Sequence, residues 1–262
     1  FIINGVERVV VSQIVRSFRV LFVAEEVQGQ RLFGAKIIPS RGAWLEFETS
    51  SRNVISVKVD RKRKILISTF LRALGLTTDQ IIQAFEGVND NLERDYIKAT
   101  LARDSAKTDD EALVEVYKRI RPGDLATPET AKTFLEAMFF NPKRYDLGRV
   151  GRYKLNRRLN LDANFDWKNR ILRIKDVVEV ISEIIRLNND PLATHDDVDN
   201  LKNRRVRAVG ELVQGKVRVG LLRMERIIKD RMSVLDPDTV TANQLVNGRP
   251  IAAVLQEFFA SS

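Results

Sequence analysis

The chain has 262 residues, 44% of them hydrophobic, enough for one large globular domain or two modest ones. Lysine and arginine number 44 against 35 aspartates and glutamates, and the net charge of +9 favours a polyanionic partner. Cysteine is absent, which excludes disulfides and thiolate metal sites, and the single histidine excludes histidine-rich ones.

The first sixty residues carry the pattern of β-structure. Val9–Val11 form an apolar run that predicts a buried strand. Ile55, Val57 and Val59 alternate with polar residues, as in a half-exposed strand. The segment Pro39–Gly42 predicts a turn between two strands.

Helices follow from about residue 65. Thr77 with Gln80, and Thr108 with Glu111, have the spacing of a capping box, in which each side chain satisfies a free backbone N–H group. Thr127 before Pro128 predicts a third helix start, because proline at the first helical position loses no hydrogen bond.

Three apolar stripes predict helices in the last third of the chain. One runs from Val177 to Ile185 and ends near residue 189, and a long basic helix covers 209–232. The last stripe, 251–259, stops without a cap, and the chain opens inside a predicted strand. We therefore expect both ends to be cuts in a larger protein. No apolar run approaches the ~20 residues needed to span a bilayer.

Positive charge is concentrated in two segments. Residues 143–158 hold seven bases and one acid, and residues 202–231 hold ten bases and three acids. Arg204, Arg205 and Arg207 stand close together, and each guanidinium can hold a phosphate or a guanine edge in two hydrogen bonds. A solvated face, or pairing with the nearby aspartates 196, 197 and 199, explains the same pattern equally well.

One aromatic residue and three polar motifs are candidate sites. Trp44 follows the turn and suits stacking on an unpaired base, although the pattern alone favours a core tryptophan. The segment Gly210–Lys216 has the glycine spacing of a phosphate loop but lacks its hydroxyl and suits a helix. Asp162 and Asp166 supply only two carboxylates, which are few for holding a pair of metal ions that must bridge phosphates. His195 before two aspartates suits a capped helix start better than a catalytic pair.

Several segments, in the same order along the chain, strongly resemble the β subunit of bacterial RNA polymerase. These are FIINGVERVVVSQ (1–13), IPSRGAWL (38–45), RIRPGD (119–124), RYDL (144–147), the VGR segment through Asn156 (150–156), NRRVR (203–207), RVGL (218–221) and EFFASS (257–262). Together they frame most of the chain.

The resemblance implies an α+β fold with mixed helices and small antiparallel sheets. It implies a partial protrusion strand over 1–13, a lobe domain over 14–206, and incomplete protrusion helices over 207–262. In that family these domains form one wall of the DNA channel. Phe18-Arg19 stands where the family has Pro-Gly, so a fixed turn is lost there.

The resemblance also implies site residues, none of them catalytic or metal-binding. Arg16, Asp199 and Arg204 match a pocket for a non-template guanine, and Trp44 matches a residue that stacks on the preceding base. Arg205, Arg152 and Arg157 are expected to contact DNA because they lie in the basic clusters. The loop Arg121, Pro122, Gly123 and Asp124 matches the gate loop. The residues Val11, Gln13, Ser261 and Ser262 match one rim of the rifamycin pocket.

The first hypothesis is therefore a lobe and protrusion segment of a DNA-directed RNA polymerase, a nucleotidyltransferase, which is inactive by itself. Its expected partners are DNA, the β′ and α subunits, the σ factor and elongation factors, without a membrane, in the bacterial cytoplasm at the nucleoid. No cofactor is expected in this segment, because magnesium in the full enzyme is bound by β′. The alternatives are a free-standing basic nucleic-acid-binding module and a metal-dependent phosphoryl-transfer enzyme that uses Asp162 and Asp166.

Overall fold

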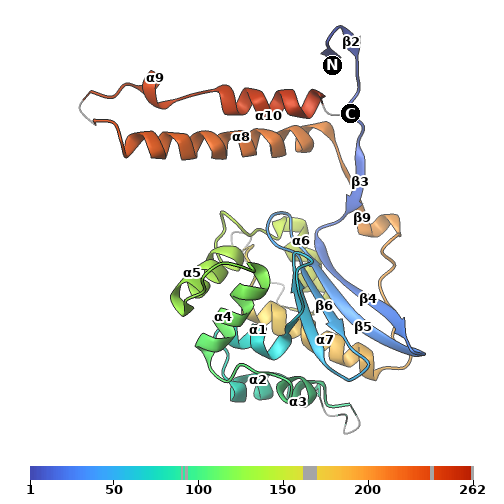
Figure 1. Cartoon of the computed structure of the whole chain (residues 1–262). Helices are drawn as coiled ribbons and strands as arrows, with labels where there is room; N and C mark the ends of the chain where they lie inside the picture. The colour runs from blue at the N-terminus through green and yellow to red at the C-terminus, as the bar shows by residue number, and fades with distance from the viewer. Residues whose placement is uncertain (90, 92–93, 162–169, 237–238, 261–262) are drawn as a thin grey trace. The chain divides into compact units, whose positions relative to one another are not determined.

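The computed structural model describes residues 1–89, 91, 94–161, 170–236 and 239–260. The chain divides into two compact units, one of residues 16–203 and one that joins residues 1–15 to the residues after 203 (Figure 1). The resemblance placed the boundaries after residues 13 and 206, and the names lobe and protrusion stay predictions.

A five-stranded antiparallel sheet organises the unit of residues 16–203. Its strands, in spatial order, are β4 (Arg19–Val27), β5 (Gln30–Ile38), β6 (Leu45–Thr49), β7 (Ile55–Val59) and β8 (Ile65–Leu66). The predicted turn at Pro39–Gly42 joins β5 to β6. Gly42 has φ +115°, and a Cβ there would lie 2.6 Å from the ring of the buried Tyr145, so this turn requires glycine.

Helices complete this unit, and their starts agree with the local sequence. They are α1 (Ile67–Ala73), α2 (Thr78–Ala84), α3 (Tyr96–Leu101), α4 (Asp109–Ile120), α5 (Pro128–Phe139), α6 (Gly148–Arg158) and α7 (Ile174–Asn189). The capping boxes predicted at Thr77 and Thr108 are confirmed, and Thr127 caps α5 just before Pro128. A 3₁₀ turn, Leu201–Asn203, ends the unit.

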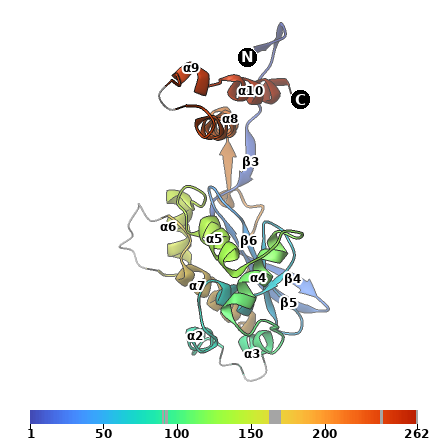
Figure 2. The same cartoon turned by 60° about the vertical axis from the view of Figure 1, so that its left-hand side comes forward.

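The helices enclose one hydrophobic core against the sheet. Helix α7 packs on β5 and α6 on β4 (Figure 2). Helix α1 packs on β7 and β8. Inward-facing residues of the strands, such as Phe22, Phe33 and Phe47, meet α7 residues such as Ile181 and Ile184 in this core. Alternation along the strands puts their other side chains on the opposite face.

The second unit consists of short strands and a helical hairpin. Its elements are β1 (Ile2–Ile3), β2 (Val6–Glu7), β3 (Gln13–Arg16, of which Arg16 belongs to the other unit), β9 (Arg204–Arg207), α8 (Val209–Met232), α9 (Ala242–Leu245) and α10 (Arg249–Ala260). Helices α8 and α10 run side by side (Figure 1). Gly220 of α8 lies so close to α10 that a Cβ would be 2.9 Å from Ile251 Cα. None of the described helices is long and apolar enough to cross a membrane.

The α+β fold class is confirmed, and two local predictions are wrong. The predicted buried strand at Val9–Val11 is irregular, with Val9 and Val11 88% and 77% exposed. Valine favours extended backbone, but burial needs a packing surface, and the described elements supply none there. His195 lies exposed in a loop rather than at a helix start, because Asp196 bonds to β4 instead. After the Phe18-Arg19 replacement the chain bends at Phe18 and enters β4.

Candidate nucleic-acid interface

Trp44 lies at the surface of the 16–203 unit, fixed by its backbone. Its N–H donates to the Asp60 carboxylate at 2.8 Å, and the Asp60 N–H donates to the Trp44 carbonyl at 3.0 Å. The ring is only partly buried and lines a surface pocket with Asp60 and Arg61. The interpretation of Trp44 as a core residue is therefore wrong, because the two hydrogen bonds hold it just before β6 with part of its ring accessible.

A cation lies over the Trp44 ring. The Arg61 guanidinium carbon is 5.5 Å from the ring centroid, and the side chain is 73% exposed and pairs with Glu46 at 3.7 Å. Asp60 and Arg61 both adopt left-handed backbone, with φ +48° and +59°. The turn Arg61–Lys64 is exposed throughout. Sequence reasoning missed this basic turn, although four consecutive cations between two strands were a visible signal.

Asp199 is carried by a loop that is fastened to the sheet edge. The Phe22 N–H donates to the Asp196 carboxylate at 2.9 Å, and the Asp196 N–H donates to the Phe22 carbonyl at 2.7 Å. The Asp199 N–H donates to the Asp197 carboxylate at 2.9 Å, and the buried Asn203 amide donates to the Asp197 carbonyl at 2.5 Å. These bonds present Asp199 to solvent on an ordered loop.

The three residues predicted for the guanine pocket are divided between the two units. Arg16 is half-buried at the end of β3, and Asp199 belongs to the same unit. Arg204 is half-buried at the start of β9, in the other unit. The assembly of this pocket therefore stays a prediction.

Arg152 does not have the predicted role. Its side chain is 0% exposed and pairs with the equally buried Asp176 at 2.7 Å, and it also donates to the Ile171 carbonyl. Burial lowers the pKa of Arg152, and the attraction of Asp176 opposes that shift. A guanidinium without accessible surface cannot touch a phosphate, so the predicted DNA contact is wrong at this position.

Arg157 lies on the same helix and faces solvent. Its neighbour Arg158 pairs instead with Glu183 of α7 at 2.7 Å. Among the described residues, no carboxylate lies within ion-pair distance of Arg157. Helix α6 thus turns Arg152 into the protein and leaves Arg157 available to a ligand.

The predicted gate loop forms an exposed turn between α4 and α5. Arg121 stacks on Phe134 of α5, with the guanidinium carbon 4.7 Å from the ring centroid, and lies 3.7 Å from Asp124. Gly123 has φ +98°, which permits the turn. The following Leu125 is 95% exposed. The turn is therefore anchored on one side and offers polar and apolar groups to a partner.

Arg205 has an acidic partner within its own unit. Its two terminal nitrogens lie 2.5 and 2.6 Å from the Glu211 carboxylate of α8, and Arg207 lies 3.8 Å from it. The hydrogen bonds from Arg205 hold the pKa of Glu211 below its usual range. A phosphate bound by Arg205 would have to compete with this carboxylate.

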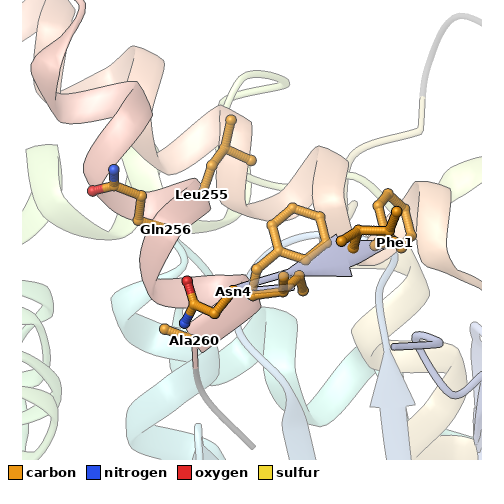
Figure 3. Close-up of a pocket in the computed structure, with 8 residues that line it drawn as sticks. Phe1, Asn4, Leu255, Gln256 and Ala260 are labelled. Carbon is orange, nitrogen blue, oxygen red and sulfur yellow. The ribbon is translucent and has the colours of Figure 1, made fainter. Parts of the chain in front are cut away.

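The predicted rifamycin rim is only partly described. Val11 and Gln13 are exposed, whereas Ser261 and Ser262 lie outside the described residues. A pocket in the same unit lies between the start of the chain and α10, where Phe1 and Asn4 face Leu255, Gln256 and Ala260 (Figure 3). No lining residue of this pocket has an ionisable side chain.

The described residues contain no group of three or more acidic, histidine or cysteine side chains able to hold a metal. Asp162 and Asp166 lie outside the described residues. The segment Gly210–Lys216 lies inside α8, as its apolar spacing predicted, so it cannot form a phosphate loop.

Comparisons with known proteins identify a family and several similar proteins. The family model described as RNA polymerase Rpb2, domain 2, matches residues 16–207. The chain is 48% identical over 266 residues to the DNA-directed RNA polymerase subunit beta of Dehalococcoides mccartyi, and 48% identical over 263 residues to that of Thermosynechococcus vestitus. The same subunit of Clavibacter michiganensis is 43% identical over 278 residues.

Each alignment covers 100% of this chain but only 21–23% of the relative, so the chain spans about a fifth of the length of these curated relatives. The segments that resemble the polymerase β subunit thus belong to a similarity that runs through the whole chain. The chain belongs to the RNA polymerase Rpb2 domain 2 family and represents part of a bacterial β subunit.

Proposed function

We propose that this chain forms part of the wall of the DNA channel in a DNA-directed RNA polymerase and binds downstream and non-template DNA. The observation that carries the proposal is the platform of Trp44 and Arg61 beside the basic turn Arg61–Lys64. An accessible aromatic ring next to exposed cations suits an unpaired strand, because bases stack on the ring while cations hold the backbone.

The chemistry of Asp199 and Arg204 supports a guanine on the same strand. An arginine fork donates to the O6 and N7 acceptors of guanine, and a carboxylate accepts the protons of the base. The ordered loop around Asp199 keeps that carboxylate in place. Arg16 would add a second donor, and Arg157 an electrostatic contact to the backbone.

The reaction, the partners and the location in this proposal are those of the whole enzyme. The nucleotidyltransferase reaction, with magnesium held by the β′ subunit, belongs to the assembled polymerase and not to this chain alone. Its partners would be the β′ and α subunits, the σ factor and, at the exposed turn Arg121–Asp124, elongation factors. The bacterial cytoplasm, at the nucleoid, is the corresponding location.

The stacking contact can be tested in the complete polymerase that carries this chain within its β subunit. The promoter DNA would carry the fluorescent base 2-aminopurine at successive non-template positions, one per experiment. We expect the probe to be quenched at one position near the start site and to brighten there in Trp44→Ala. The lost stacking corresponds to about 1–3 kcal/mol. Trp44→Phe should retain part of the quenching.

Tyr153→Ala is the matched control, since it removes another accessible aromatic ring from the same unit, 52% exposed. It should leave the quenching unchanged. Unaltered fluorescence at every position in Trp44→Ala, or the same brightening in Tyr153→Ala, would contradict the proposal.

The guanine contact has a separate readout. Arg204→Ala should weaken the preference for guanine at one non-template position by about 1–3 kcal/mol. The rate of RNA extension on other templates should change little, because the residue touches no reacting group. An unchanged guanine preference would remove Arg204 from the pocket.

A further inference from the structure

Three cations converge where β4 begins. Arg19 is the first residue of β4, and Lys154 and Arg158 lie on α6, which packs on that strand. The contact is close because Gly151 lies against Phe18, where an added Cβ would be 3.2 Å from the Phe18 Cβ.

Two of the three cations are held only by neutral oxygens among the described residues. Arg19 donates to the Asn203 side-chain oxygen and to the Val20 carbonyl, and Lys154 donates to the Ser17 hydroxyl at 2.9 Å. Neither lies within 4.0 Å of a described carboxylate. Arg158 is already satisfied by Glu183.

The partial burial of these groups is unfavourable without an anion. Burial lowers the pKa of Lys154, and the positive charge of Arg19 lowers it further. Burial also lowers the pKa of Arg19, where Asp196 opposes the shift and Arg158 adds to it. An anion between Arg19 and Lys154 would stabilise both charged forms, because it replaces lost hydration and screens their repulsion.

Asp196, whose charge acts on Arg19, is already engaged. The Asp196 carboxylate accepts the Phe22 N–H at 2.9 Å, and this bond fastens the loop to β4. Moving Asp196 onto Arg19 or Lys154 would break that bond. Among the residues that the structure describes, no carboxylate therefore uses the anion-binding capacity of Arg19 and Lys154.

We propose that Arg19 and Lys154 form a binding site for one phosphate group of a nucleic-acid backbone. The guanidinium can give two parallel hydrogen bonds and the ammonium a compact charge, while the buried Ser17 holds the ammonium in place. The choice of a phosphodiester rests on the proposed function. Free phosphate or pyrophosphate has the same chemistry and is distinguished by the test.

The test measures binding of the full 262-residue chain to a short fluorescent single-stranded DNA by anisotropy over a range of salt concentrations. Each phosphate that is neutralised contributes about 0.7 to the slope of log K against log salt for a single strand. We expect Arg19→Gln and Lys154→Gln each to lower the slope by about that amount. Lys154→Arg, which keeps the positive charge, should have the slope of the wild-type chain.

Arg52→Gln is the matched control, because Arg52 is an exposed arginine in the turn between β6 and β7 of the same unit. It should leave the slope unchanged. Thermal unfolding by circular dichroism verifies that each variant is folded at the assay temperature. A folded Arg19→Gln chain with the wild-type slope, or an equal fall in Arg52→Gln, would overturn the site.

Calorimetric measurement of pyrophosphate binding distinguishes a nucleic-acid phosphate from free phosphate or pyrophosphate as the ligand. Pyrophosphate binding that is lost in Arg19→Gln while the DNA slope is unchanged would overturn the assignment to nucleic acid. Failure of the wider proposal looks different. In that case the wild-type chain itself would show no salt-dependent DNA binding, and Trp44→Ala would leave the probe fluorescence unchanged.

Discussion

In the unit of residues 16–203, two ion pairs lie in the interior, whereas the described pairs of the unit that contains α8 and α10 are partly or largely exposed. Arg152 and Asp176 are both 0% exposed, and Arg72 and Asp104 are 5% and 2% exposed. In the other unit, Lys216 and Glu257 are 38% and 61% exposed. The same residue types therefore serve both the core and the surface in the first unit, whereas none of the described pairs of the second unit lies in the interior.

The two units also differ in how they bury apolar groups. The first has one continuous core that joins the sheet to its helices. In the second, Val254 is the one buried apolar side chain among the described residues, and Leu222 and Val234 are 54% and 83% exposed. Basic composition alone cannot tell a structural arginine from a ligand-binding one, because burial decides between these roles.

The largest effect is expected at the buried pair. Arg152→Ala should lower the free energy of unfolding by about 3 kcal/mol, the lower end of the range for breaking a buried pair. The lower end applies because Arg173 still lies 2.8 Å from Asp176. Urea unfolding measures the change. Arg157→Ala, on the same helix but exposed, is the control and should change stability by less than about 0.5 kcal/mol. Equal losses in both variants would erase the distinction between interior and surface arginines.

A smaller effect is expected where the second unit packs most closely. Gly220→Ala places a Cβ 2.9 Å from Ile251 Cα and should destabilise the α8–α10 hairpin by about 1–2 kcal/mol, since overpacking outweighs the gain in helix propensity. At Gly215 the nearest atom is 3.9 Å away, so Gly215→Ala should stabilise α8 by up to about 1 kcal/mol. Hydrogen exchange of the α8 amides measures both. Stabilisation by Gly220→Ala would mean that the helices do not pack through this residue.

The smallest effect is a pH dependence of the surface pair. Arg205 holds the pKa of Glu211 below its usual value of 4.5, so the pair contributes stability above that value and loses it as the pH falls through the lowered pKa. The melting temperature of the wild-type chain should exceed that of Glu211→Gln at neutral pH. The difference should be small, as exposed pairs contribute below about 1 kcal/mol. It should shrink in acid, and a difference that grows in acid would contradict the pairing.

The sequence predicted best those elements that local chemistry determines. The starts of α2 and α4 follow from the hydrogen bonds of Thr77 and Thr108 to residues three positions ahead. The bounds of α8 also agree with the prediction of 209–232. The prediction of a buried strand at Val9–Val11 failed because burial depends on a packing surface elsewhere in the chain. Local spacing contains no information about that surface.

The candidate site was less predictable for the same reason. The partner of Arg152, Asp176, lies on a different helix, and no spacing rule brings them together. The exposure of Trp44 depends on Asp60, which reaches it from the far end of β7. The basic turn Arg61–Lys64 can be predicted from sequence, since it needs only four adjacent cations between two strands.

We propose that exposed cations of the 16–203 unit bind nucleic-acid phosphates, while its buried cations stabilise the fold. The most direct measurement is the salt dependence of duplex DNA binding by the wild-type chain, Arg157→Gln and Arg152→Gln, at a temperature where all three are folded. We predict that Arg157→Gln lowers the slope of log K against log salt by about 0.9, the contribution of one phosphate, and that Arg152→Gln leaves it unchanged. An unchanged slope in Arg157→Gln, or an equal fall in Arg152→Gln, would contradict this account.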